Sequence, residues 1–298
     1  MRRDAMKKVR FDGFTVPMLL LLPQMAIVVV FFLWPSWEAV WSSFHLEDPF
    51  FGNATFVGVD NYVDAVTRSD YGRSALFTAL FVAFICLFAL GIALWLAVAA
   101  DAVLRGQGPY KTLLMWVYAI APPVAGLIGV MMFDQHIGPL IEFARWLGWD
   151  MQFGVDYWDT AFAMMVVAAW KQIPVNFIFF LSGLQGIPKS LREAAAIDCR
   201  SSTRRFWTVV FPLLAPTSFF LLVINITYAF FETFGTIDVM LKGEPGNNPV
   251  TLVYKVFLDG FRGQDLGGSS AQSVILMVAV FLLTVFQFRF IERRVHYA

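Results

Sequence analysis

Five stretches of this chain contain no Asp, Glu, Lys or Arg and are long enough to cross a membrane. Each has 22 to 27 residues, whereas a helix needs roughly 20 to cross the hydrocarbon layer; they cover residues 13–37, 74–100, 112–133, 206–231 and 266–288. A sixth apolar stretch, 160–187, is interrupted only by Lys171. The sequence therefore predicts six transmembrane helices, placed approximately at residues 13–37, 74–100, 112–133, 160–182, 212–232 and 268–288.

Composition and pattern exclude the main alternative classes. At 58% hydrophobic and 15% charged over 298 residues, the chain is too apolar for a soluble protein of this size. Strands of a membrane β-barrel alternate in polarity over about ten residues, and these runs do not alternate. The expected fold class is an all-α polytopic membrane protein, with residues 1–298 as a single domain. The first run exceeds the 7–15 apolar residues of a signal peptide, so we expect it to remain as an anchor.

The basic residues predict the orientation of the spans. Fifteen of the 22 Lys and Arg lie before the first span, in 101–111, in 189–205 or after the sixth span, and six lie in the segments of the opposite side. Cytoplasmic segments carry the excess of Lys and Arg. We therefore expect both termini and the loop 187–211 in the cytoplasm, with the N-terminal basic residues meeting anionic membrane lipid.

The residues that support chemistry are scattered. The three histidines are dispersed, and Cys86 and Cys199 are expected in a span and in a cytoplasmic loop, so neither a metal cluster nor a disulfide is indicated. Neither a phosphate-binding loop nor a Gly-x-Ser-x-Gly elbow occurs. We expect a chain that is not an enzyme and binds no cofactor.

Two spans contain features that bear on packing or on a pathway. In the third span, Pro122-Pro123, with Gly126 and Gly129 nearby, should interrupt the helix. Such a break is tolerated where other helices or a water-filled cavity satisfy the freed carbonyls, so a pathway-lining kink and a packing kink both remain open. The second span is rich in small residues toward its inner end, which favours close packing of helices.

Polar residues occur within the fourth and fifth spans. Lys171 would cost about 2.5–3.5 kcal/mol at mid-membrane on insertion scales, so it is a candidate site residue, although its long stem also allows snorkelling or a structural ion pair. Two polar stripes accompany it, at i, i+4 and at i, i+3, i+7: Gln172 and Asn176, then Asn225, Tyr228 and Glu232. Buried amides often only bond across helices, but the two stripes and the lysine together favour a polar cavity.

The loop between the fourth and fifth spans is the longest basic segment expected in the cytoplasm. Pro188 should end the fourth span, and Ser190-x-x-Glu193 is a capping-box pattern, so a short helix is expected from about Ser190 to Asp198. Leu191, Ala194 and Ala195 would give it a small apolar face suited to a groove. The basic run 200–205, which includes Arg204, precedes Phe206 and Trp207. Held between two spans, this loop can transmit force from a soluble partner.

The same loop resembles the EAA motif of ATP-binding-cassette (ABC) importer permeases, written EAA-x3-G-x9-I-x-L-P. Glu193, Ala194 and Ala195 occupy its first three places, Pro212 occupies the last, and Cys199 stands where the family has glycine. Asp198 and Phe206 match the form of the motif in the maltose-type sugar permeases. A side chain at 199 would be strained if the turn requires positive φ. Downstream, Lys242-Gly243-Glu244-Pro245 replaces the Thr-x-Gly-Gly-Pro common in these permeases.

The resemblance implies a fold, a set of partners and a location. The fold is that of a type I ABC importer permease in the bacterial cytoplasmic (inner) membrane. The partners are a second permease, an ATPase dimer that uses ATP and Mg, and an external substrate-binding protein, with no nucleic acid. The residues implied in coupling to the ATPase are Glu193, Ala194, Ala195, Asp198, Cys199, Arg204, Phe206 and Pro212.

Within this family, three segments resemble the A-type permeases of sn-glycerol-3-phosphate importers. These are Trp170-Lys171-Gln172-Ile173, Tyr228-Ala229-Phe230-Phe231 and Ala271-Gln272-Ser273-Val274. The implied solute is sn-glycerol-3-phosphate or a related glycerophosphodiester, for which Lys171 is a suitable phosphate partner. The alternatives are a sugar or oligosaccharide permease, a scaffold without a pathway, and a secondary transporter, which would show paired carboxylates or broken helices in two related halves.

Overall fold

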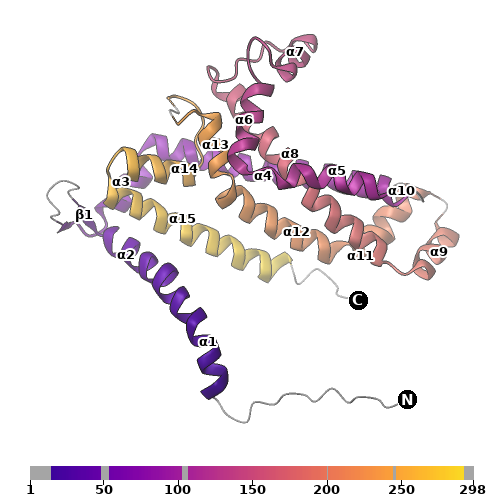
Figure 1. Ribbon diagram of the computed structural model, residues 1–298, viewed down its shortest axis with the longest axis horizontal. Helices are drawn as coiled ribbons and strands as arrows, with labels where there is room; N and C mark the ends of the chain where they lie inside the picture. The colour runs from indigo at the N-terminus through magenta and orange to yellow at the C-terminus, as the bar shows by residue number, and fades with distance from the viewer. Residues whose placement is uncertain (1–14, 48–53, 103–106, 200, 244–245, 292–298) are drawn as a thin grey trace.

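The computed structural model describes residues 15–47, 54–102, 107–199, 201–243 and 246–291, and it is almost entirely helical (Figure 1). Within these residues, the helices are joined or extended by five short π-helical segments: Val29–Leu33, Phe206–Val210, Tyr228–Glu232, Leu258–Arg262 and Gln287–Ile291. The helices are α1 (Thr15–Val28), α2 (Trp34–Ser42), α3 (Asp60–Thr67), α4 (Ser69–Asp101), α5 (Gln107–Ala119), α6 (Pro122–Met132), α7 (Pro139–Trp146), α8 (Tyr157–Gly186), α9 (Lys189–Asp198), α10 (Ser202–Arg205), α11 (Phe211–Leu213), α12 (Ala215–Thr227), α13 (Phe234–Met240), α14 (Leu252–Phe257) and α15 (Leu266–Phe286).

Five continuous helical stretches of the described chain are long and apolar enough to cross a membrane, and a sixth is bent. The continuous ones are Pro17–Ser42, Ser69–Asp101, Tyr157–Gly186, Ala215–Glu232 and Leu266–Arg289. The stretch predicted as the third span consists of Thr112–Ala119 and Pro122–Met132, which meet at 101°. The prediction of six spans therefore holds if this bent pair counts as one span.

The bend of the third span coincides with Pro122-Pro123. Ala121 has extended backbone angles (φ −61°, ψ 144°), and α6 restarts with proline in its first turn. Beyond the bend α6 packs against α13 (Figure 1), where the Thr236 hydroxyl donates a hydrogen bond of 2.9 Å to the Pro122 carbonyl. A Cβ on Gly126 would lie only 2.6 Å from the Thr236 carbonyl oxygen. The break at Pro122-Pro123 is therefore held by packing against α13.

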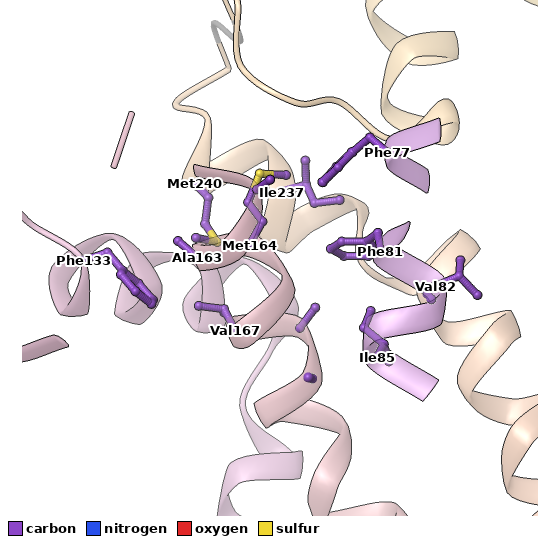
Figure 2. Packing of buried hydrophobic residues seen from close by; sticks show 14 of the residues in the cluster. Phe77, Phe81, Val82, Ile85, Phe133, Ala163, Met164, Val167, Ile237 and Met240 are labelled. Carbon is purple, nitrogen blue, oxygen red and sulfur yellow. The ribbon is translucent and has the colours of Figure 1, made fainter. Parts of the chain in front are cut away.

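The most extensive helix contact joins α4 and α8. Ala89, Ala93 and Ala97, spaced four residues apart on α4, are fully buried, as expected for small residues that let helices approach closely. Gly91 and Ala99 on the same helix are exposed. Toward the other end of α4, apolar side chains of α4, α8, α13 and the end of α6 form a packed cluster (Figure 2). It includes Phe77, Phe81, Val82, Ile85, Phe133, Ala163, Met164, Val167, Ile237 and Met240.

The first span lies apart from the rest of the molecule. In its most apolar window no residue is buried, and Figure 1 shows α1 leading away from the other helices. Its far end is held, because α2 packs against α15. An apolar helix with no buried residue in this window is consistent with a surface that faces lipid or another subunit.

A small β-hairpin follows the first span, which the sequence did not predict. Strands β1 (His45–Glu47) and β2 (Ala54–Phe56) are antiparallel, with His45 opposite Phe56. The Asn61 amide donates 3.0 Å hydrogen bonds to the carbonyls of Ser43 and His45, which holds the hairpin against α3. Strands of three residues are too short to leave an alternating pattern. The N-terminal basic segment, Arg200, Glu244 and Pro245 lie outside the described residues.

Candidate functional site

The helix expected after Pro188 is α9, and it begins slightly differently from the prediction. It covers Lys189–Asp198 with Pro188 as its N-cap, and no side chain caps it. The capping-box interpretation of Ser190 and Glu193 is therefore wrong. Proline presets φ and lacks an N–H group, so the helix starts directly after it and Ser190 falls inside the first turn, with Glu193 further along.

One face of α9 is apolar, acidic and uncovered. Leu191 is 47% exposed and Ile197 is 86% exposed, and Glu193 and Ala194 between them are also exposed. Only Ala195 of the predicted apolar face is buried, at 6%. Ile197, not singled out from the sequence, lies i+3 from Ala194 and i+4 from Glu193, so all three share a face. This face is complementary to a groove in another molecule.

An ion pair attaches α9 to the second span. The Arg192 guanidinium contacts the carboxylate of Asp101, the last residue of α4. The Asp101 side chain is only 13% exposed and that of Arg192 is 37% exposed. Sequence reasoning missed this pair because 91 residues separate its members. The available signal was that Asp101, after the second span, and Arg192, near the start of the loop helix, carry opposite charges on the same predicted side of the membrane.

A groove of about 880 Å³ separates α9 and α10 from the last turns of α4. Arg192 and Asp101 both line it. The remaining lining is largely apolar and includes Gly91, Leu94, Trp95, Val98, Leu191, Phe206 and Trp207, together with the acidic Glu193. The ion pair therefore connects α9 to α4 beside a hollow rather than through a packed core.

The turn after α9 accommodates cysteine without strain. Cys199 has φ −123° and ψ 105°, ordinary extended angles, so this turn does not require glycine. The Ser201 side chain then accepts from the Arg204 backbone N–H at 3.5 Å and caps α10. Phe206 packs against Trp207 and Phe211. Arg204 is exposed, Pro212 lies in α11, and Asp198 ends α9.

Three of the six pathway candidates bond to one another or to backbone. The amides of Asn176 and Asn225, both fully buried, exchange hydrogen bonds of 3.0 and 2.7 Å. Tyr228 donates to the carbonyl of Ala168 at 3.2 Å. These contacts join α8 to α12 and the following π-helical segment. The packing interpretation accounts for all three.

The other three candidates are Lys171, Gln172 and Glu232, of which Lys171 lies near the end of α5. Lys171 is 7% exposed, and its Nζ lies 5.6 Å from the centroid of Tyr118 on α5. Glu232 is exposed and acts on Lys171 electrostatically, and Gln172 is buried beside it on α8. Sequence reasoning missed Tyr118, whose partner is 53 positions away. A partly shielded ammonium with one carboxylate nearby can bind an anion.

Comparison with known proteins shows the family of this chain. Residues 90–297 match the family described as binding-protein-dependent transport system inner membrane component. The chain belongs to this family. The sn-glycerol-3-phosphate transport system permease protein UgpA of Brucella suis biovar 1 (strain 1330) is 51% identical over 98% of this chain and 100% of its own. The UgpA of Rhizobium meliloti (strain 1021) is 49% identical over 98% of this chain and 100% of its own.

Solved structures agree on the fold. A bacterial ABC transporter involved in the import of the acidic polysaccharide alginate superposes with a TM-score of 0.80 at 17% identity, covering 94% of this chain and 96% of that one. A second structure, of a bacterial alginate ABC transporter in complex with a periplasmic protein bound to alginate pentasaccharide, gives 0.72 at 18% identity and covers 92% of both chains. The family match and these superpositions together confirm the predicted fold of a multi-pass ABC importer permease of the inner membrane.

Proposed function

We propose that this chain is one of two permease subunits of an ATP-driven, binding-protein-dependent importer of sn-glycerol-3-phosphate or related glycerophosphodiesters. It performs no catalysis. A separate ATPase dimer uses ATP and Mg, and an external protein delivers the solute. Support for the solute comes from the full-length relatives at 49–51% identity, which are named as sn-glycerol-3-phosphate permeases.

The observation that carries the coupling role is the uncovered face of α9. Leu191, Glu193, Ala194 and Ile197 are exposed on a short helix that two spans hold at both ends. The side chain of Ile197 is 86% exposed, and contact of its apolar surface with water is unfavourable unless a partner covers it. The ATPase subunit is that partner, so α9 lies in the cytoplasm with both chain termini. Closure of the ATPase dimer on ATP moves α9 and changes the side from which the pathway is open.

Lys171 is the proposed contact for the solute phosphate. Its ammonium is shielded from bulk water, and a phosphate oxygen is a strong acceptor for such a donor. Glu232 balances the charge when no solute is bound. Asn176, Asn225 and Tyr228 keep α8 and α12 in register and do not contact the solute.

Reconstitution with the ATPase, the second permease and the binding protein tests this function. Uptake of sn-glycerol-3-phosphate should require ATP and all partners. Glu193→Lys should lower ATP-dependent uptake at least tenfold, because it reverses the charge on the face that meets the ATPase. Lys189→Gln, which alters an exposed charge on the same helix, is the matched control and should retain uptake.

Three outcomes would contradict the proposal. Uptake by this chain alone would make it a secondary transporter. Uptake of an oligosaccharide but not of the phosphate ester would overturn the solute. Full uptake by the Glu193→Lys transporter would remove α9 from the coupling contact.

A further inference from the structure

A polar pocket of about 310 Å³ lies at the end of the molecule opposite α9. Figure 1 shows α3, β1 and the start of α15 at one end and α9 with α10 at the other. The lining residues come from these elements and from the residue between α3 and α4: Leu46, Asn61, Asp64, Ala65, Thr67, Arg68, Asp265, Gly268 and Gln272. The volume is at the lower end of the range for ligand pockets, about 300–1,000 Å³.

The charges around this pocket do not balance. Behind it, Lys255 is 6% exposed and pairs with Asp70 at 2.7 Å and Asp259 at 3.1 Å. Arg68 pairs with Asp70 at 3.3 Å. The two cations, Lys255 and Arg68, thus pair with the carboxylates of Asp70 and Asp259. Among the described residues, the carboxylates of Asp64 and Asp265 have no cation within ion-pair distance.

The pKa of Arg68 reports the same negative surroundings. Partial burial acts to lower this pKa, but Asp70, Asp259 and Asp265 outweigh it and raise the pKa above its ordinary value. The pocket therefore favours a positively charged guest.

A buried acceptor without a donor adjoins these carboxylates. Gln272 is 2% exposed, and its Nε2 donates to Asp259 Oδ2 at 2.7 Å. An ionised carboxylate only accepts hydrogen bonds, so this contact fixes the orientation of the amide. Gln272 Oε1 consequently faces the other way and has no donor among the described residues. A buried acceptor left in this state costs about 1–3 kcal/mol, which a donor from a guest would offset.

The guest is an organic cation rather than a metal ion. Among the described residues no group of three or more His, Cys, Asp and Glu is arranged to hold a metal. Asp265 also uses Oδ1 to accept the Gly268 N–H at 2.8 Å as the N-cap of α15. An ammonium or guanidinium matches the remaining acceptors, because it carries several donors on one charge.

We propose that this pocket receives a lysine or arginine side chain of the external binding protein, so that Asp64, Asp265 and Gln272 form part of its docking site. The inference rests on the proposed function, in which this end of the molecule faces outward. The walls of the pocket are held together by two contacts. The Asn61 hydrogen bonds join α3 to the hairpin, and the close approach of Gly267 to His45 joins α15 to the hairpin. A preformed pocket lowers the ordering cost of association.

The test titrates the substrate-loaded binding protein against ATP hydrolysis by the complete transporter in lipid nanodiscs. Asn at 265 preserves the helix cap, so Asp64→Asn and Asp265→Asn remove charge with little risk to folding. The double variant should raise the concentration for half-maximal stimulation about tenfold, with the maximal stimulated rate kept. Because screening weakens charge pairs, the effect should shrink as salt increases. Asp60→Asn, one turn before Asp64 and outside the pocket lining, should leave the titration unchanged.

The outcomes separate the two proposals. Half-maximal stimulation within about twofold of the parent, a shift equal to that of Asp60→Asn, or a loss of maximal rate alone would each overturn the docking role. A parent transporter that the binding protein does not stimulate would instead overturn the proposed function.

Discussion

Arg192 on α9 and Asp101 at the end of α4 form an ion pair that joins the exposed loop helix to the second membrane span. Both residues line the groove of about 880 Å³ between α9 and α4, so the pair connects the two helices beside a hollow. We therefore expect a displacement of α9 to be transmitted to α4, and through the α4–α8 contact to the helix that carries Lys171.

Breaking this ion pair should uncouple ATP hydrolysis from transport. Exposed pairs contribute about 0.2–1 kcal/mol, and Asp101 is mostly buried, so we expect about 1 kcal/mol, or roughly a fivefold fall in solute imported per ATP. Asp101→Asn and Arg192→Gln should have similar effects, and the double variant should be no worse than either, measured by parallel uptake and phosphate release. Additive losses in this double-mutant cycle would show that the residues act separately.

Neutralising Lys171 should weaken recognition of the phosphate ester specifically. A hydrogen bond to a charged group contributes about 1.5–3 kcal/mol, so Lys171→Met should raise the KM for sn-glycerol-3-phosphate uptake tenfold or more. Lys171→Arg keeps the charge and should retain most of the affinity. An unchanged KM in Lys171→Met would remove this residue from the pathway.

The Asn176–Asn225 pair should contribute to stability and not to selectivity. Asn225→Leu leaves the buried Asn176 amide without its partner and should cost about 1–2 kcal/mol, measured as a lower thermal unfolding midpoint in detergent. Replacing both residues by leucine should recover most of that loss, since no unpaired amide remains. A changed KM in the stable double variant would instead place the pair in the pathway.

Gly126 should not tolerate a side chain, because a Cβ there would lie 2.6 Å from the Thr236 carbonyl oxygen on α13. Backbone cannot rotate away as a side chain can, so Gly126→Ala should destabilise the protein by about 1–3 kcal/mol. Gly91→Ala is the matched control, since nothing lies within 4 Å of its Cβ position, and should be neutral or stabilising by up to about 1 kcal/mol. Equal midpoints for the two variants would contradict the tight α6–α13 contact.

The spans and α9 could be predicted because each leaves a local signal. Long runs without charge have few folded solutions in lipid, and Pro188 marks a helix boundary. The spacing of Gln172 with Asn176, and of Asn225 with Tyr228 and Glu232, likewise identified which helix faces are polar. It did not reveal that these faces meet each other, because that depends on how α8 and α12 are rotated in the bundle.

The features that sequence reasoning missed are non-local or too short. Asp101 meets Arg192 across 91 positions, and Tyr118, one residue before the end of α5, lies beside Lys171 of α8. Pro122-Pro123 predicted a break, but the angle of 101° between the two halves of the third span depends on how α6 packs on α13. The three-residue strands of the hairpin lie below the length at which alternation is visible.

Replacing Cys199 by glycine should not stabilise the loop, although the EAA motif that the loop resembles has glycine at this place. Glycine helps where φ is positive, and Cys199 has φ −123°. Cys199→Gly increases only the freedom of the unfolded chain and should cost about 0.4–1 kcal/mol, with uptake unchanged, while Cys199→Ala should be close to neutral. The measurement is the thermal unfolding midpoint of each variant beside the parent. A higher midpoint for Cys199→Gly than for Cys199→Ala would show that this turn favours a left-handed conformation.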